Sequence, residues 1–406
     1  MAKKKAAEGG IDDGFFESLA EETGGDVLDH IDSVKYFVDT GSLALNYICS
    51  GQFITGGIPG GKLTEIYGPN SSSKSLIGAN ILFGTQKVKG IPVLIDCENS
   101  ANKEFIQQAS HCNLKRIVRH TPETLEEVFA KMYKVIEKAR EKTSLDVPLV
   151  IVYDSIGVSP SARELREVQL PEGYTKAQFK AIVGANEQPG ERAKICSREF
   201  RKLNTVMEKH NATVVILNQT RDKIGTYVPT KTTAGGGNAL PFYASCRLET
   251  KSMMKIEKKI TAKKKKYLGI NVKVKNVKNK THRPFVESEN IQLLFDKGIN
   301  PISGLLSCLL DAERIEIKGA GNFAVCPAFS NGEEVKFKAS IDRNDVPIEI
   351  LLKCPALIDA GSSDQVQQYL EPYKEALENR AEDDSEIEMS EVSSMDDEDI
   401  DESLEG

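Results

Sequence analysis

The chain has 406 residues, a formal net charge of −7, 40% hydrophobic side chains, eight cysteines and five histidines. This length supports one large core, and no apolar run approaches the roughly 18 residues of a membrane span, which argues against an integral membrane protein. Without a C-x-x-C pair neither a disulfide framework nor a zinc site is indicated, and without a predicted secretory signal we expect a soluble, cytoplasmic protein.

Residues 1–34 are predicted to hold an arm and one short helix. Asp12 and Asp13 can cap an amphipathic segment that contains Phe15, Phe16 and Leu19, and two glycines end it. Its apolar side chains could pack on the core of the same subunit or on a neighbouring copy.

A phosphate-binding loop is predicted next. Residues 63–67 read as a strand, GPNSSSKS follows, and residues 76–83 have a helical pattern, which is the order of a P-loop. The consensus has glycine where this chain has Ser73, and a positive φ there would cost serine about 1–2 kcal/mol. The predicted ATP-binding residues of this loop are Gly68, Pro69, Asn70, Ser71, Ser72, Ser73, Lys74 and Ser75.

Three further apolar runs, residues 91–95, 148–153 and 213–217, read as buried strands separated by helical stretches. They end in Glu98, Asp154 and Gln219. Because ligands bind at the carboxyl ends of parallel strands, an α/β fold with its active site at this edge is predicted.

The predicted roles follow from the chemistry of each group. Lys74 would contact the β- and γ-phosphates, while Ser75 and Asp154 would hold Mg²⁺, partly through water. Glu98 is placed to orient or deprotonate the attacking water. Gln219 can bond the γ-phosphate and move its loop when that group is lost.

After Gln219 the chain has a polar loop that ends in three glycines near residue 236, and a strand is expected at residues 242–248. The loop carries Arg221 and Lys223, and bare glycine amides can approach a phosphate closely. We therefore predict that it binds a ligand rather than being merely disordered.

Residues 251–280 contain twelve lysines and a single acid, Glu257. A hairpin tip is predicted before the strand 269–275. A lysine run is often only a solvated face, but beside a loop that can approach phosphates it is expected to bind phosphate groups. The tip residues are Lys263, Lys264, Lys265 and Lys266.

Residues 301–380 are predicted to form a small α+β domain, with helices at 305–310, 347–352 and 365–380 and a hairpin near Asn331. Residues 381–406 are predicted to be a disordered acidic tail. Without the 13 acids of 382–406, the chain has 53 basic and 47 acidic residues, or +6. The tail could serve solubility or compete for the lysines with the phosphate ligand that they bind.

The order of several motifs resembles the bacterial RecA recombinases across roughly residues 35–325. With its acidic tail and with Ser73 in the P-loop, the chain resembles the bacteriophage-encoded, UvsX-type members of this family. The motifs are TGSLALNYICSG (40–51), GGIPGGKLTEIYGP (56–69), LIDCENS (94–100), VYDS (152–155), NQTRDKIG (218–225), GGGNALPFYASCRLE (235–249) and VKNK (277–280).

This resemblance implies a RecA-type P-loop core over residues 35–300, with a mostly parallel twisted sheet, a small N-terminal helical segment and a small α+β C-terminal domain. It implies that the N-terminal segment makes filament contacts, and that DNA binds at loops of about 159–192 and 219–241 and at the hairpin 251–280. The first loop is longer here than is usual in the family.

The resemblance also implies residue roles. Phe105 would stack on adenine, with Asn102 near the base, while Lys278 and Lys280 would reach the ATP of a neighbouring subunit. The implied DNA-binding residues are Lys194, Arg201, Arg221, Lys223, Gly236, Gly237 and Asn238.

The favoured hypothesis is an ATP-dependent recombinase that forms helical filaments on single-stranded DNA, pairs it with homologous double-stranded DNA and exchanges strands, with DNA-stimulated ATP hydrolysis. Expected partners are both forms of DNA, further copies of the chain, and single-strand-binding and mediator proteins. The alternatives are a hexameric RecA-fold helicase and an ATP-binding recombination mediator. A phage-encoded protein would act in the host cytoplasm or nucleoid.

Overall fold

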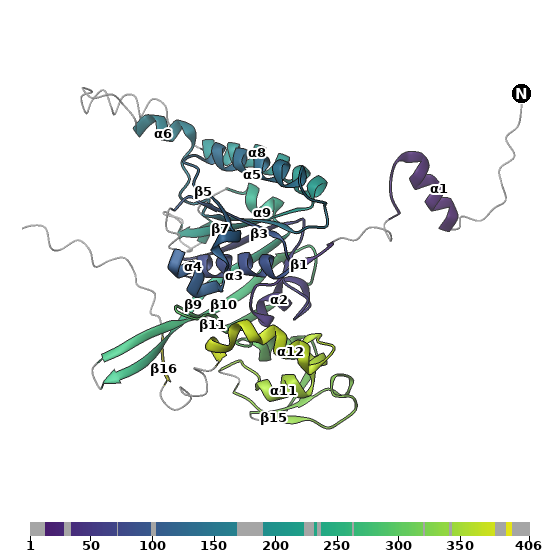
Figure 1. Ribbon diagram of the computed structural model, residues 1–406, viewed down its shortest axis with the longest axis vertical. Helices are drawn as coiled ribbons and strands as arrows, with labels where there is room; N and C mark the ends of the chain where they lie inside the picture. Colours follow the sequence, from purple (N-terminus) through teal and green to yellow (C-terminus); the bar gives the residue numbers. More distant parts are fainter. Residues whose placement is uncertain are drawn as a thin grey trace, which may run out of the picture. The chain divides into compact units, whose positions relative to one another are not determined.

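The computed structural model describes residues 13–27, 34–70, 72–98, 103–168, 190–222, 231–233, 237–261, 264–319, 321–340, 343–377 and 387–391 (Figure 1). The chain divides into two compact units, Met1–Lys35 and Tyr36–Gly406. In the first, helix α1 (Asp13–Thr23) confirms the predicted amphipathic helix. Its Phe15, Phe16 and Leu19 are 49%, 50% and 46% exposed.

The second unit is built on an 11-stranded sheet in the order β12-β11-β10-β9-β3-β7-β6-β4-β5, with β8 and β16 paired outside this path. The neighbours from β9 to β5 run parallel, and those from β9 to β12 are antiparallel. The mostly parallel α/β prediction is confirmed. The strands are β3 (Leu63–Gly68), β4 (Ile91–Asp96), β5 (Val118–His120), β6 (Leu149–Asp154), β7 (Ala212–Asp222), β8 (Lys231–Thr233), β9 (Cys246–Thr261), β10 (Lys264–Asn279), β11 (Glu287–Leu294) and β12 (Gly298–Ile299).

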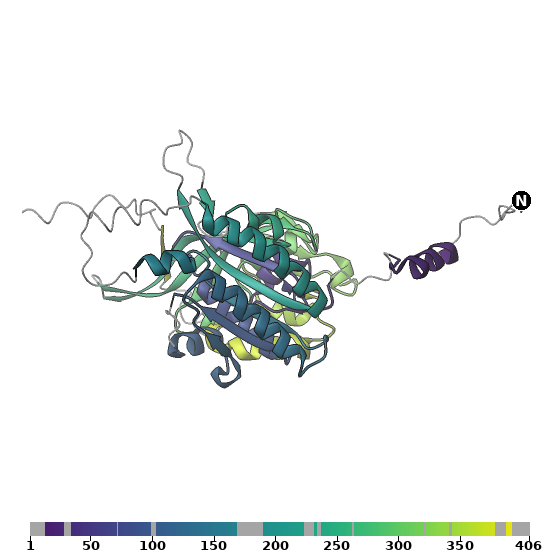
Figure 2. The same cartoon turned by 90° about the horizontal axis from the view of Figure 1, so that it is seen from above.

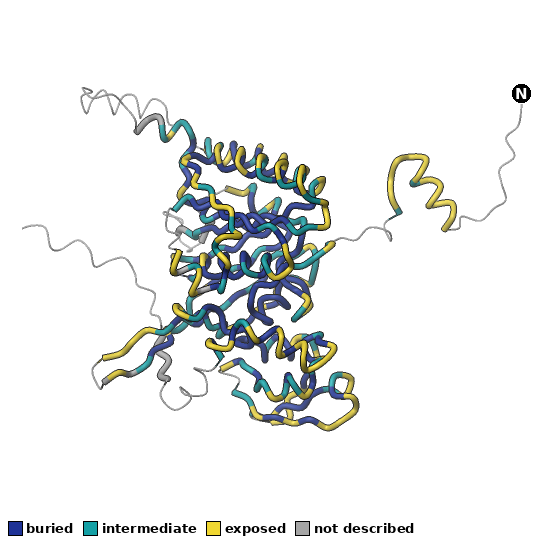
Figure 3. Tube along the Cα trace, in the orientation of Figure 1, coloured by how far each residue is buried: buried dark blue, intermediate teal, exposed yellow. Residues whose placement is uncertain are grey.

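Helices cover both faces of this sheet, because the central strands are apolar on both sides. Ile66, Val152 and Leu217 pack on one face with α2 (Leu43–Ser50) and α3 (Lys74–Lys87). Ile151 and Ile216 pack on the other with α5 (Leu125–Arg140) and α8 (Glu191–His210), which run side by side in Figure 2. Figure 3 shows the buried strands beside α5 and α8, whose outer surfaces are exposed.

The remaining elements of the core are short. A two-stranded sheet of β1 (Phe37–Val38) and β2 (Ile58–Pro59) lies outside the large one. The connecting helices are α4 (Lys103–Ser110), η2 (Leu114–Arg116), α6 (Ala162–Val168) and α9 (Ala239–Tyr243).

The polar segment after β7 is more regular at its ends than predicted. Strand β7 continues to Asp222, and its last residues pair with β8 in an antiparallel hairpin. The strand predicted at 242–248 is wrong in its first half, where α9 forms and β9 begins only at Cys246. Pro241 lies in the first turn of α9, where its missing N–H removes no helical hydrogen bond.

The C-terminal part confirms the predicted mixture of helices and strands. A three-stranded antiparallel sheet is formed by β13 (Ile315–Gly319), β14 (Asn322–Val325) and β15 (Lys336–Lys338). The predicted hairpin corresponds to the β14–β15 connection, in which Asn331 has a φ of 53°. The helices are α10 (Leu305–Asp311), η3 (Pro327–Phe329), α11 (Ile348–Lys353), η4 (Pro355–Ile358), α12 (Ser363–Leu370) and η5 (Glu371–Tyr373).

Within the segment predicted to be an acidic tail, β16 (Ile387–Glu391) pairs antiparallel with the part of β9 that extends beyond the core. The register places Met389 opposite Ile256. Among the described residues, no helix is both long and apolar enough to cross a membrane.

Candidate active site

The loop after β3 has the backbone of a phosphate-binding loop. Ser73, directly before α3, has φ 59° and ψ 24°, so the position that the consensus gives to glycine is left-handed here. Because the φ of Ser73 is positive, the steric cost predicted for serine at this position applies. Gly68 is required for another reason, because a Cβ at this residue would lie 2.2 Å from the backbone oxygen of Thr250.

The loop surrounds the ammonium group of Lys74. Its Nζ donates to Gly68 O at 3.2 Å, Pro69 O at 2.7 Å and Ser72 Oγ at 3.1 Å. Burial lowers the pKa of Lys74, while the charges of Asp154 and Glu98 oppose that shift. A phosphate can accept hydrogen bonds from a buried ammonium group and from the backbone N–H groups of a helix N-terminus, so this arrangement fits a phosphate-binding site.

Ser75 and Asp154 lie together, as the predicted magnesium site requires. Asp154 ends β6 and is hydrogen-bonded to the Ser75 side chain. Burial raises the pKa of Asp154 to about 6; Glu98 and Asp96 add to this, and Ser75 and Lys74 oppose it. A hydroxyl beside a carboxylate fits Mg²⁺, which binds one or two protein oxygens and keeps several waters.

Glu98 and Gln219 also meet at this edge. Gln219 Nε2 donates to Glu98 Oε1 at 3.2 Å, and Ser155 Oγ donates to the same oxygen at 2.5 Å. The predicted water-orienting carboxylate and the predicted sensor amide are thus joined directly. Ser155, which follows a cis peptide bond with Asp154, is a site residue that the sequence did not single out.

A second pair missed from the sequence lies next to this site. Asp96, 1% exposed, accepts from Arg119 Nη2 at 2.6 Å and Nε at 3.1 Å. Arg119 lies on β5, a short edge strand that the pattern of apolar runs did not predict. Its charge offsets that of Asp96, one of the two carboxylates that raise the pKa of Asp154.

A cavity of about 300 Å³ opens beside Ser75 and Asp154, between α3, α4 and the sheet. Ile106 of α4 lines it. Phe105, the predicted adenine contact, lies one residue earlier on α4, but its side chain is outside the described part. Ser71 and Asn102 also lie outside the described residues.

The predicted DNA-binding residues are partly described. Lys194 and Arg201 are exposed on α8, and Asn238 is exposed at the N-terminus of α9. Gly237 has a φ of 53°, and a Cβ there would lie 3.2 Å from the Cβ of Ala193, so the end of the second loop meets the first turn of α8. Arg221 is the second-last residue of β7, and its side chain is outside the described part. Lys223, Gly236 and Lys263 are outside the described residues.

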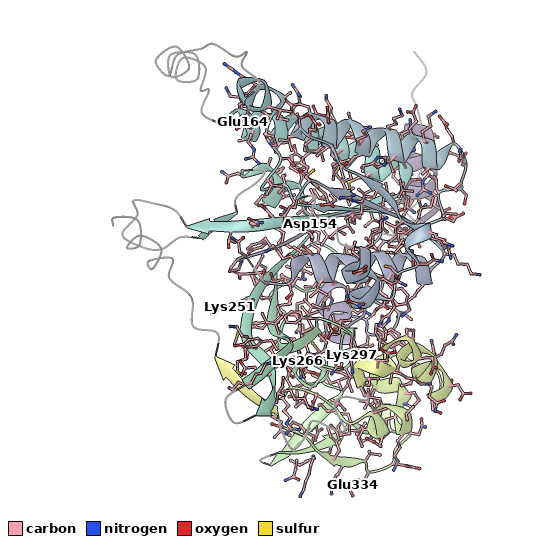
Figure 4. The ribbon with its side chains drawn as sticks, turned by 60° about the vertical axis from the view of Figure 1, so that its left-hand side comes forward. Asp154, Glu164, Lys251, Lys266, Lys297 and Glu334 are labelled. Carbon is pink, nitrogen blue, oxygen red and sulfur yellow. The ribbon has the colours of Figure 1, made fainter. Side chains whose placement is uncertain are left out.

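The basic hairpin is a separate region (Figure 4, where Asp154, Lys251 and Lys266 are labelled). Lys264, Lys265 and Lys266 are exposed on β10. Lys265 contacts Glu257 at 2.8 Å, and Lys266 lies 4.0 Å from Asp296.

The two predicted interface lysines lie at the end of β10. Lys278 Nζ donates to the carbonyls of Pro241 at 2.7 Å and Phe242 at 2.8 Å, which belong to α9. Burial lowers the pKa of Lys278, and the charges of Lys280 and Arg247 lower it further. Lys280 is exposed.

Comparison with known proteins adds independent information. The profile of the RecA N-terminal domain matches residues 22–300. "Protein RecA" of Mycoplasma mobile is 30% identical over 332 residues, which cover 82% of this chain and 89% of that protein. "Protein RecA" of Thermus aquaticus is 30% identical over 284 residues, covering 70% and 74%.

A solved structure, "Crystal structure of the RadB recombinase", superimposes with a TM-score of 0.41 at 18% identity, covering 66% of this chain and 100% of that one. Because this score indicates only a loose superposition, the relationship to known proteins is taken from the sequence comparisons. The matched profile spans β3, β4, β6 and β7 and therefore includes every residue of the nucleotide edge described above.

Proposed function

Because this chain belongs to the RecA recombinase family, we propose that it forms helical filaments on single-stranded DNA and catalyses homologous pairing and strand exchange, with DNA-stimulated ATP hydrolysis. The acidic tail and Ser73 support a bacteriophage, UvsX-type member of the family. We propose that such a protein would act on DNA in the cytoplasm or nucleoid of a bacterial host.

The contact between Gln219 and Glu98 is the observation that carries this proposal. Glu98 stands at the end of β4, where it can orient a water toward a phosphate held by Lys74 and the α3 N-terminus. Gln219 stands at the entrance to the glycine-ended segment. When its amide exchanges Glu98 for a γ-phosphate oxygen, Glu98 is freed for catalysis and the DNA-binding segment is pulled with Gln219.

Magnesium bound at Ser75 and Asp154 would neutralise charge on the phosphates. Asp154 supports this role because the metal would replace the proton that burial favours on its carboxyl group. The adenine would lie toward α4, which carries Phe105.

An edge groove supports head-to-tail assembly. It has a volume of about 470 Å³ and lies between β5 and α5, with Val93, Val118 and Val135 among its apolar lining. Helix α1 offers exposed Phe15 and Phe16 among acidic residues, and four exposed lysines line the groove. We propose that α1 of one copy docks in this groove of the next, and a contact between different surfaces that does not close gives a helical filament. The lysines are Lys131, Lys134, Lys138 and Lys142.

The opposite contact surface is proposed to lie around Lys278 and Lys280. Two large aromatic side chains near these lysines are exposed: Phe242, whose carbonyl accepts from Lys278, at 70%, and Phe285, shortly after Lys280 in the chain, at 68%. Phe285 also has a φ of 69°, which is unfavourable for a bulky residue and is found most often at functional positions. A neighbouring subunit placed here would bring its triphosphate to the two lysines.

DNA would bind through the loop ends near Lys194, Arg201 and Gly237 and through the lysines of the hairpin. Phosphate contacts give affinity without sequence preference, and base pairing between strands then tests homology. Single-strand-binding and mediator proteins are proposed as partners that load the filament.

An ATPase assay with and without single-stranded DNA tests the proposal, with Lys74→Ala as the inactive control. We expect stimulation of at least tenfold by DNA and no activity in the variant. Electron microscopy with DNA and a non-hydrolysable ATP analogue shows the assembly: filaments are expected, and rings would indicate a helicase. DNA binding without turnover in the ATPase assay would indicate a mediator.

A further inference from the structure

Glu65 is a buried carboxylate outside the nucleotide site. It lies in the middle of β3 with no exposed surface. Its Oε1 accepts from Asn218 Nδ2 at 2.8 Å, and its Oε2 accepts from Arg247 Nε at 2.5 Å. A buried charge requires such partners, because desolvation otherwise costs several kcal/mol.

The backbone places this carboxylate in a row across four strands. Ile216 of β7 lies opposite Glu65, Glu65 lies opposite Arg247 of β9, and Arg247 lies opposite Lys278 of β10. Directly opposite residues point to the same face of a sheet. The row therefore connects β7, the strand that carries Gln219, to β10, the strand that carries Lys278.

Both ends of the glycine-ended DNA segment are tied to this row. Its start follows Asn218, whose amide is held by Glu65. Its end leads into α9, whose last carbonyls, those of Pro241 and Phe242, accept from Lys278. Arg247, between the two, also stacks on Tyr67, with 4.7 Å from the guanidinium carbon to the ring centroid.

Stability alone does not explain this arrangement. Replacing a buried ion pair by uncharged side chains of similar volume is often neutral for stability, whereas removing one partner is strongly destabilising. Arg247 is also 16% exposed and faces the charge of Lys278, which is an unusual place for a purely structural pair.

We propose that Glu65 and Arg247 are positioning residues that clamp the two ends of the DNA-binding segment and couple it to Lys278. The inference rests on the proposed function, because it assumes that Lys278 binds the triphosphate of a neighbour. When Lys278 leaves the α9 carbonyls for that triphosphate, α9 is released while Glu65 keeps Asn218, the residue before Gln219, in place. The neighbour's nucleotide thus acts on the end of the segment without disturbing its start.

The decisive variant is Glu65→Gln/Arg247→Met, which removes both charges and keeps an acceptor for Asn218. We expect its melting temperature and its affinity for a fluorescent ATP analogue to change little, with less than a threefold loss of affinity. DNA stimulation of kcat should fall at least tenfold, with little change in KM for ATP. The single variant Arg247→Lys keeps the positive charge beside Glu65, so it should retain part of the DNA stimulation that the double variant loses.

Arg314→Met is the matched control, because Arg314 pairs with Asp359 at 2.7 Å and is 13% exposed, far along the chain from the site. It should lower the melting temperature and leave the DNA stimulation ratio unchanged. Wild-type stimulation in the double variant would overturn the clamp.

A second measurement is independent of catalysis. Trypsin cleavage between residues 219 and 241, followed by mass spectrometry, should be at least fivefold faster in the double variant than in the wild type without nucleotide. Equal rates would reject the clamp even if the wild type proved to have no DNA-stimulated activity, whereas faster cleavage with an unstimulated wild type would reject only the proposed function.

Discussion

The nucleotide edge and the basic hairpin belong to the same sheet but differ in how their charges are held. At the edge, Lys74 is buried with three oxygen acceptors, and Glu98 has two donors. On the hairpin, Lys264 and Lys266 are exposed, and Lys266 lies 4.0 Å from the exposed Asp296, although Lys265 pairs with the buried Glu257 at 2.8 Å. Hydrolysis needs groups held at fixed positions, whereas capture of any DNA sequence needs only positive charge. The first region should therefore respond sharply to single substitutions and the second only to several together.

The largest effect is expected for Glu98→Gln. A group that orients or deprotonates water contributes typically about 10²–10⁴-fold, so DNA-stimulated turnover should fall by that factor while ATP-dependent DNA binding persists. Steady-state ATPase and filter-binding assays measure the two. Turnover within threefold of the wild type would remove Glu98 from catalysis.

Asp154 should make the stability of the nucleotide edge depend on pH. Its folded pKa of about 6 lies above the ordinary value of 3.8, so the folded state holds the proton more tightly and stability falls as pH rises from about 4 to 6. In magnesium-free buffer Asp154→Asn should be more stable than the wild type above pH 6, by on the order of 3 kcal/mol at most, and about equal near pH 4. Denaturant unfolding measures this, and a difference that does not vary with pH would contradict it.

The hairpin should need several substitutions. Changing Lys263, Lys264, Lys265 and Lys266 together to alanine should weaken double-stranded DNA binding about 10- to 100-fold at low salt and reduce the salt slope by up to about 0.9 per lost contact. Single-strand binding should be largely kept. Lys336→Ala/Lys338→Ala, on exposed lysines of the small sheet, is the control. An unchanged salt slope in the fourfold variant would show that the hairpin does not contact phosphates.

The acidic tail tests whether the hairpin is regulated. Deleting residues 382–406 should increase double-stranded DNA binding several-fold at low salt and little at high salt, since exposed charges are screened there. Met389→Pro keeps every acid but removes a backbone donor from β16, which pairs with β9. If only the deletion increases DNA binding, the charge of the tail is responsible for the inhibition. If both changes increase it, the pairing of β16 with β9 is responsible. No change in either leaves the tail a solubility device.

The smallest effect is expected at Ser73. Glycine has no steric penalty at a φ of 59°, so Ser73→Gly should stabilise the protein by about 1 kcal/mol. Ser73→Ala, which keeps the Cβ, should not. Thermal unfolding distinguishes them, and equal melting temperatures would show that the loop relaxes around serine.

The nucleotide edge could be predicted from the sequence because its signals are local. An apolar run followed by a polar residue indicates a strand end, and the parallel arrangement then brings Lys74, Glu98, Asp154 and Gln219 to one edge. Even the left-handed Ser73 could be anticipated from its place in the loop. The resemblance added the family but not the contacts.

Other features depend on pairing between distant segments and were not predictable. Arg119 contacts Asp96 only because β5 pairs beside β4, and Arg247 meets Glu65 only because β9 lies beside β3. Nothing in the sequence around either arginine indicates which carboxylate it contacts. The start of β9 and the helix before it were misjudged because short apolar runs fit a strand and a helix equally well.

The sequence by itself therefore determined the alternation of strands and helices, the phosphate loop and the charge imbalance between body and tail, since periodicity, motif and composition are properties of neighbouring residues. The tertiary structure alone decided which side chains hold each carboxylate: Gln219 and Ser155 hold Glu98, and Arg247 and Asn218 hold the buried Glu65. The physical reason is that the partners of a buried charge are set by strand order and register, which bring residues more than a hundred positions apart into contact.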